Sequence, residues 1–302
     1  MTEATDRFVA GSGPIVVGVD GTPASTSAAR WAAAVADRFG APLELINAGH
    51  STRSALGEAA AAIRSAVLAA QQEAATGVLE SVEHQIRADF PGLDVVTVRS
   101  DEPIDTLLIA RSRDARLIVL GSDDLSAAAA LVVGSTTLAV TGHSSCPVVA
   151  WRGAVREATS QPIVLGVDGE RTGAAAFAAA FEFADRFGVE LRAVHAWPAP
   201  HPDFLTPFQA DWDGLEALQW SVLLNAVEPW TKRYPAVKVT NYLERGNPAE
   251  ALLKHASDAQ LVVVANRGRG AVASALLGST SLNLLHHCRV PVLLGHTVSD
   301  RT

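Results

Sequence analysis

The chain repeats itself, and this internal repeat limits what it can fold into. Three motifs recur in the same order: IVVGVDG at 15–21 returns as IVLGVDG at 163–169, ADRFG at 36–40 returns at 184–188, and Gly134-Ser135-Thr136 returns as Gly278-Ser279-Thr280. The offset is 148 residues for the first two motifs and 144 for the third. A repeat of this length in a chain of 302 residues predicts two domains, at residues 1–153 and 160–302, joined by a short polar linker.

The composition is that of a globular protein without a membrane span. Hydrophobic residues make up 48% of the chain and charged residues 19%. No apolar run reaches the roughly 18 residues that a membrane-spanning helix needs. Residues 1–13 also lack the apolar segment of a secretory signal. We therefore expect a cytoplasmic protein that does not engage a membrane.

Charge and cysteine usage exclude several classes of function. The net charge of −8 and the pI near 5.6 disfavour a nucleic-acid partner, because the average field repels a phosphate backbone. The P-loop pattern GxxxxGK[ST] is absent from the sequence. Cys146 and Cys288 lie at positions that are not equivalent in the repeat and form no CxxC pair. We expect neither a structural disulfide nor a metal site.

Alternating strands and helices indicate an α/β fold. Continuous Val, Ile and Leu runs predict strands that are buried on both faces, hence parallel sheets covered by helices on either side. The expected strands are 15–20, 43–48, 95–99, 117–121 and 147–151 in the first half, and 163–168, 190–197, 237–243, 261–265 and 291–295 in the second. The helices expected in the first half are 24–39, 58–90, 103–113 and 135–142. Each half is thus predicted to be a doubly wound domain with a five-stranded parallel sheet.

One segment of the second half fits no regular element. Residues 198–214 read PAPHPDFLTPFQADWDG, with four prolines and bulky aromatic side chains. This composition predicts an ordered loop. A lid and a docking surface are both compatible with it.

Polar and glycine residues follow the strands at which a ligand is expected. Open parallel sheets bind ligands at the carboxyl ends of the strands, where the strand order reverses. Asp20 and Asp168 end the first strand of their halves, and Gly121 and Ala265 end the fourth. A Gly-Ser-Thr helix start then presents backbone amides and hydroxyls, which can donate to phosphate oxygens. The sequence therefore predicts a phosphate-sized loop near the aspartate in each half.

These residues resemble the nucleotide-binding members of the universal stress protein family, which carry G-x2-G-x9-G-[ST] after the fourth strand and an aspartate at the end of the first. The resemblance covers essentially the whole chain, twice, as in tandem two-domain members. It implies an adenine nucleotide alpha hydrolase-like fold, with strand order 3-2-1-4-5 in each half. It also implies a regulatory stress-response protein that binds ATP, with Mg²⁺ carried by the phosphates.

In the family the aspartate contacts adenosine and the loop holds the phosphates. Carried over by position, these roles fall in the first half on Gly18, Asp20, Gly121, Gly134, Ser135 and Thr136. In the second half they fall on Gly166, Asp168, Ala265, Gly268, Gly270, Gly278, Ser279 and Thr280, with positive charge from Arg267 and Arg269.

Each half departs from the family pattern at a different glycine. In the first half Asp124 replaces the second glycine, beside Asp123. A carboxylate about 4 Å from a phosphate costs roughly 1 kcal/mol in bulk water and about 4 kcal/mol at an effective dielectric of 20. The alternative is that these acids hold Mg²⁺ against the triphosphate. In the second half Ala265 replaces the first glycine, at a strand end that tolerates a methyl group, so we expect the second half to bind ATP better.

Structural roles compete with the functional ones. Asp20 and Asp168 also suit capping of the following helix, and Ser135 and Ser279 suit N-cap positions. Trp197 suits either core packing or stacking on a base. AMP or a cyclic nucleotide would use much of the same pocket as ATP.

No pairing of a nucleophile with a base is visible, so we expect no catalytic residue. The rival to an ATP-dependent regulator is an interaction protein that binds no nucleotide, with Asp124 and Ala265 as its best support. A third candidate is a weak ATPase.

The last strands begin with proline and lie at the sheet edge in the family's order, which favours a homodimer. A regulator also implies a protein partner, which the sequence does not identify.

Overall fold

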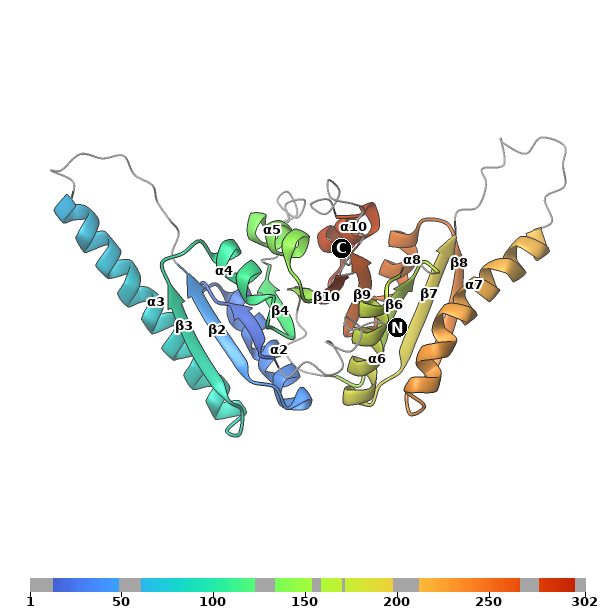
Figure 1. The fold of residues 1–302 in the computed structure, drawn as a ribbon, viewed down its shortest axis with the longest axis horizontal. Helices are drawn as coiled ribbons and strands as arrows, with labels where there is room; N and C mark the ends of the chain where they lie inside the picture. Colours follow the sequence, from blue (N-terminus) through green and yellow to red (C-terminus); the bar gives the residue numbers. More distant parts are fainter. Residues whose placement is uncertain are drawn as a thin grey trace. The chain divides into compact units, whose positions relative to one another are not determined.

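The computed structural model describes residues 13–48, 61–122, 134–153, 159–169, 172–197, 212–266 and 277–296. These residues form two compact units, one within Gly11–Ala158 and the other within Thr159–Thr302. Each unit is a parallel sheet with helices on both faces (Figure 1). The predicted fold, two tandem doubly wound α/β domains, is confirmed.

The first unit has five parallel strands in the order β3-β2-β1-β4-β5. The strands are β1 (Ile15–Gly18), β2 (Leu43–Ala48), β3 (Val95–Ser100), β4 (Leu117–Gly121) and β5 (Val148–Trp151). The helices are α2 (Pro23–Phe39), α3 (Ala61–Asp89), α4 (Ile104–Arg111) and α5 (Ser135–His143). The helices α2 and α3 contact each other on one face, and α4 and α5 contact each other on the other face.

The second unit repeats this plan in the order β8-β7-β6-β9-β10, again with parallel pairing throughout. The strands are β6 (Ile163–Val167), β7 (Leu191–Trp197), β8 (Val239–Arg245), β9 (Leu261–Asn266) and β10 (Val292–His296). The helices are α6 (Ala174–Phe187), α7 (Trp212–Arg233), α8 (Pro248–His255) and α10 (Ser279–His287). When the strands of each unit are numbered along the chain, both sheets therefore have the strand order 3-2-1-4-5.

Continuous apolar strands are buried from both sides. In β1, the consecutive residues Ile15, Val16 and Val17 are each 0% exposed. Because neighbouring side chains of a strand point to opposite faces, burial of all three requires helices on both faces. Val16 packs with Leu108 of α4 and Ile118 of β4 in one core cluster.

The repeated ADRFG motif ends a helix in each unit. Gly40 and Gly188 follow the last residues of α2 and α6 and take up left-handed backbone, with φ of 61° and 64°. Their N–H groups donate to the carbonyls of Ala36 and Ala184, which satisfies the end of each helix. Glycine adopts this conformation without the steric penalty of a side chain. The repeated motif thus ends the corresponding helix in both units.

Several predicted boundaries shift by up to three residues, and two differences concern segments singled out in the sequence. Helix α7 begins at Trp212, so the last three residues of the predicted loop 198–214 are helical, and this part of the prediction was wrong. The rest of that loop, 198–211, lies outside the described residues. The strand predicted at 15–20 ends earlier, because β1 stops at Gly18 and Asp20 lies in the turn after it.

Candidate functional site

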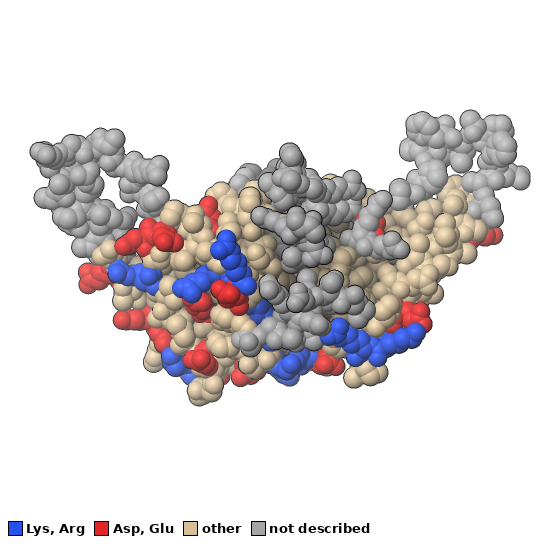
Figure 2. All heavy atoms as spheres, in the orientation of Figure 1, with Lys and Arg blue, Asp and Glu red and all other residues tan. Residues whose placement is uncertain are grey.

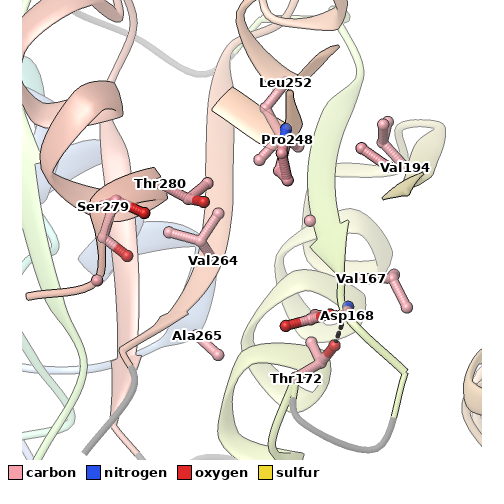
Figure 3. A pocket seen from close by; sticks show the side chains of 14 residues that line it. Val167, Asp168, Thr172, Val194, Pro248, Leu252, Val264, Ala265, Ser279 and Thr280 are labelled. Carbon is pink, nitrogen blue, oxygen red and sulfur yellow. Dashed lines mark hydrogen bonds between the residues drawn. The ribbon is translucent and has the colours of Figure 1, made fainter. Parts of the chain in front are cut away.

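The carboxyl ends of β6 and β9 and the start of α10 border one pocket in the second unit (Figure 3). The structure brings together here six of the residues singled out in the sequence: Gly166, Asp168, Ala265, Gly278, Ser279 and Thr280. Their hydroxyl, carboxylate and backbone groups form a polar side of the pocket. Asp168 and Ala265 are far apart in the chain, and the parallel sheet brings their strand ends together beside the start of α10.

Helix α10 begins at this pocket without a side-chain cap. Its N-cap is Gly278, with φ of −61° and ψ of 153°, and this glycine provides no side-chain cap. The first-turn N–H groups therefore keep their hydrogen-bonding capacity. Ser279 and Thr280 add hydroxyls beside them. The N-cap reading of Ser279 is wrong, because Ser279 is the first residue inside the helix.

Asp168 lies in a turn between β6 and α6. Its backbone N–H donates to Thr172 Oγ1 at 2.6 Å (Figure 3). Gly169 follows with φ of 55°, which glycine accepts readily. The N-cap of α6 is Gly173, so Asp168 does not occupy the capping position. The turn holds its half-buried carboxylate at the pocket.

The remaining wall of the pocket is apolar. Val194 and Ala196 come from β7, and Pro248 and Leu252 come from α8. Asn247 starts α8 by accepting a hydrogen bond from the Ala249 N–H at 2.8 Å. Sequence reasoning missed this wall and Thr172. The signals were present, namely the end of the second strand for Val194 and Ala196 and the Asn-Pro helix start for α8.

Ala265 fits its site because the close approach of α6 falls on another strand. In the described residues only glycines have positive φ, so Ala265 carries no backbone strain. The close approach of α6 instead occurs at β10, where a Cβ on Gly295 would lie 2.9 Å from the Ala176 Cα. Helix α6 accordingly packs on both β9 and β10.

In the first unit the equivalent residues stand at the ends of β1 and β4 and at the start of α5. Gly18 ends β1, Gly121 ends β4, and Gly134 precedes Ser135 and Thr136, the first residues of α5. Gly134 is the N-cap of α5, and within the described ranges no side chain caps that end. The N-cap reading of Ser135 is therefore wrong for the same reason as in α10.

Asp20 supports the cap of α2 and is not itself the cap. Thr22 is the N-cap and accepts a hydrogen bond from the Ser25 N–H at 3.2 Å. Asp20 Oδ1 accepts from the Thr22 N–H at 3.0 Å and from Thr22 Oγ1 at 2.7 Å. Partial burial raises the pKa of the Asp20 carboxyl, but hydrogen bonds from Ser25 and Thr22 outweigh it and hold the pKa below its ordinary value of 3.8.

Several predicted site residues cannot be placed. Arg267, Gly268, Arg269 and Gly270 lie outside the described residues, as do Asp123 and Asp124 of the first half. The expectation that acids weaken the first site, or hold Mg²⁺ there, stays a prediction.

Acidic and basic side chains are interspersed on the face of the first unit drawn in Figure 2.

Across the described ranges, no group of three or more His, Cys, Asp or Glu side chains could hold a metal ion. Among the helices of the same ranges, none is long and apolar enough to cross a membrane.

Comparison with known proteins identifies the family. The model of the universal stress protein family matches twice, at residues 12–152 and 159–296. A universal stress protein of Mycolicibacterium smegmatis is 33% identical over 285 residues, covering 93% of this chain and 96% of the relative. A universal stress protein of Mycobacterium tuberculosis is 31% identical over 288 residues, covering 93% and 95%. The chain belongs to the universal stress protein family, with two such domains in tandem.

A solved structure supports the same fold. The crystal structure of a universal stress protein from Archaeoglobus fulgidus aligns with a TM-score of 0.69 at 19% identity, covering 96% of this chain and 98% of that one. This family is a stress-response class, and its members are generally regulatory proteins and not enzymes.

Proposed function

We propose that the protein is an ATP-dependent regulator and that its second unit holds the nucleotide. The observation that carries this proposal is the arrangement of one pocket. The uncapped start of α10, the Asp168 carboxylate and an apolar wall from β7 and α8 all border it. Phosphates require donors, as at a helix N-terminus, and a base requires apolar surface with a few polar contacts.

Each wall suits one part of ATP. Gly278, Ser279 and Thr280 would hold phosphate oxygens through backbone N–H and hydroxyl groups. Asp168 would accept from the ribose, and the wall containing Val194 and Leu252 would contact the base. Mg²⁺ would be carried mainly by the phosphates, since hard cations of this size usually keep waters and phosphate ligands. AMP or a cyclic nucleotide remains a competitor for this pocket, and displacement of labelled ATP by each compares them.

Paired double variants of the full chain test the assignment to the second unit. Ser279→Ala/Thr280→Val removes the hydroxyls at α10, and Ser135→Ala/Thr136→Val makes the same change at α5. A hydrogen bond to a charged group contributes about 1.5 to 3 kcal/mol, so the α10 variant should lose at least about tenfold in MgATP affinity by calorimetry. The α5 variant should keep the tighter site unchanged.

Two results would contradict this proposal. Loss of the tighter site in the α5 variant, with the α10 variant unaffected, would move the nucleotide to the first unit. Absence of saturable MgATP binding, together with no thermal stabilisation, would favour an interaction protein that binds no nucleotide. Binding at 100 times Kd should stabilise the fold by about 2.7 kcal/mol.

In this proposal ATP acts by shifting which conformation a protein partner meets, and such a shift requires that ATP bind the two conformations with different affinities.

We further propose a homodimer formed through edge strands and a cytoplasmic location, where ATP is available. Sedimentation with and without MgATP measures the oligomer. Slow turnover that disappears in Ser279→Ala would instead favour the weak ATPase.

A further inference from the structure

A second cavity in the second unit, of about 870 Å³, lies between α6 and α7. We propose that it binds a small aromatic carboxylate at a site separate from the proposed nucleotide pocket, with Asp168 lining both. The two sites lie on opposite faces of the sheet, because neighbouring side chains of a strand point to opposite faces. In β7, Val194 and Ala196 line the first pocket, whereas His195 between them lines the second.

One wall of the cavity is apolar and partly aromatic. Phe177 of α6 and Trp230 of α7 lie almost parallel, with ring centroids 5.7 Å apart and an interplanar angle of 7°. Val222, Ala226 and Pro229 of α7 continue this wall. A planar ring gains both burial and offset stacking against such a surface. The cavity therefore favours an aromatic ligand, and its volume is in the range of small-molecule sites.

A hydrogen-bonded pair forms part of the lining. His195 is buried, with Nδ1 2.8 Å from the Val167 carbonyl oxygen and Nε2 2.9 Å from Gln219 Oε1. Because a carbonyl only accepts, Nδ1 donates to Val167, and in this tautomer Nε2 accepts. The Gln219 amide therefore faces Nε2 through its NH2 group, and the fixed ring orients this polar group of the lining.

Positive potential comes from two sources in the lining. Helix α6 begins at Ala174 after the N-cap Gly173, which has no side chain, so the helix dipole acts on the cavity. The Arg233 guanidinium lies 5.9 Å from the centroid of the Trp230 ring. Asp168 also lines the cavity and repels anions. This balance favours a ligand with one negative charge over one with two.

The first unit provides a reference for this lining. Val78 of α3 lies against Gly21, where a Cβ would approach it to 3.0 Å, and Val222 of α7 lies against Gly169, where a Cβ would approach it to 2.9 Å. These contacts match α3 with α7, position by position.

On this match, the first unit has different side chains at three lining positions. The matched pairs are Val82 and Ala226, Ile86 and Trp230, and Asp89 and Arg233. Val82 and Ile86 are buried, at 3% and 0% exposure. Asp89 forms an ion pair with Arg30 of α2 at 2.7 Å, which joins the two helices. The aromatic and cationic lining, from Trp230 and Arg233, thus belongs to the second unit and does not follow from the fold.

Calorimetry on the full-length protein with naphthalene-2-carboxylate tests the proposal. We expect one saturable site per chain that MgATP does not displace, and about tenfold weaker binding of the neutral naphthalene-2-carboxamide. Ala226→Phe places a ring in the cavity and should abolish binding. Circular dichroism and the thermal transition establish that this variant is folded.

Neighbouring cations supply a matched control. Arg233→Gln should weaken the carboxylate about tenfold and leave the amide unchanged. Lys232→Gln removes the same charge from the preceding residue. Lys232 pairs with Glu228 at 2.7 Å and does not line the cavity. It should change affinity by less than about twofold. Absence of saturable binding, binding that survives Ala226→Phe in the folded variant, or equal weakening by both charge variants would overturn the proposal.

Discussion

A Cβ on Gly121 would lie 2.7 Å from the carbonyl carbon and oxygen of Ala24. This separation is too short for any real side chain, and the opposing atoms are backbone at the start of α2, which cannot rotate away. Gly121 is therefore required by helix packing before any ligand is considered. In the second unit α6 makes its close approach at Gly295 instead, which leaves room for Ala265.

Gly121→Ala should destabilise the chain. The overpacked methyl group forces α2 away from β4, and overpacking of this kind costs about 1 to 3 kcal/mol. Urea unfolding followed by circular dichroism measures the loss. Gly77→Ala is the matched control, because Gly77 lies inside α3 and no described atom would be within 4 Å of its Cβ. That variant should gain about 0.5 to 1 kcal/mol. Equal stability of the two variants would contradict the packing explanation.

Thr172→Val should weaken MgATP binding by the second unit. It removes the oxygen that accepts from the Asp168 N–H at 2.6 Å and so loosens the turn that holds the carboxylate. Thr172→Ser keeps the hydroxyl and should bind like the wild type. Titration calorimetry compares the two. A loss in Thr172→Ser, with Thr172→Val unaffected, would show that the methyl group, and not the hydrogen bond, matters.

The stability difference between wild type and Asp20→Asn should depend on pH. The Asp20 pKa is lowered in the folded state, so its carboxylate stabilises the fold above the unfolded pKa near 3.8. This contribution disappears as the pH falls through the folded-state value. At pH 7 the difference should stay below about 1 kcal/mol, since the side chain is exposed and screened. Urea unfolding at a series of acidic pH values measures the difference in unfolding free energy. A difference that does not change with pH would assign the effect to the shape of the side chain and not to its charge.

The two cysteines should be unreactive in the native protein. Burial raises the pKa of the Cys146 thiol to about 12, and Cys288 is 3% exposed. The thiolate is the reactive form, and little of it exists at pH 8 in such surroundings. A thiol-specific dye should therefore titrate two free cysteines after denaturation and almost none before it. Rapid labelling of the folded protein would contradict this burial.

Local patterns predicted most of the fold. Apolar runs located all ten strands to within two or three residues, because burial on both faces requires continuous hydrophobicity. The ADRFG motif marked two helix ends, because a glycine there adopts left-handed backbone. The grouping of Asp168 with Ser279 and Thr280 followed from parallel strands ending at one edge.

Long-range contacts could not be read in the same way. The sequence suggested that Gly121 served a phosphate, whereas the structure gives it a packing role against Ala24. Thr172 and the wall from α8 join the pocket only through tertiary contacts.

By itself, the sequence determined two doubly wound domains and the strand ends where their polar residues gather, since periodicity and glycine positions act locally. The tertiary structure decided which glycine accommodates which helix and that the two faces of β7 border different cavities. These outcomes depend on how close α6 and α7 approach the sheet, and that distance is set by side chains far apart in the chain.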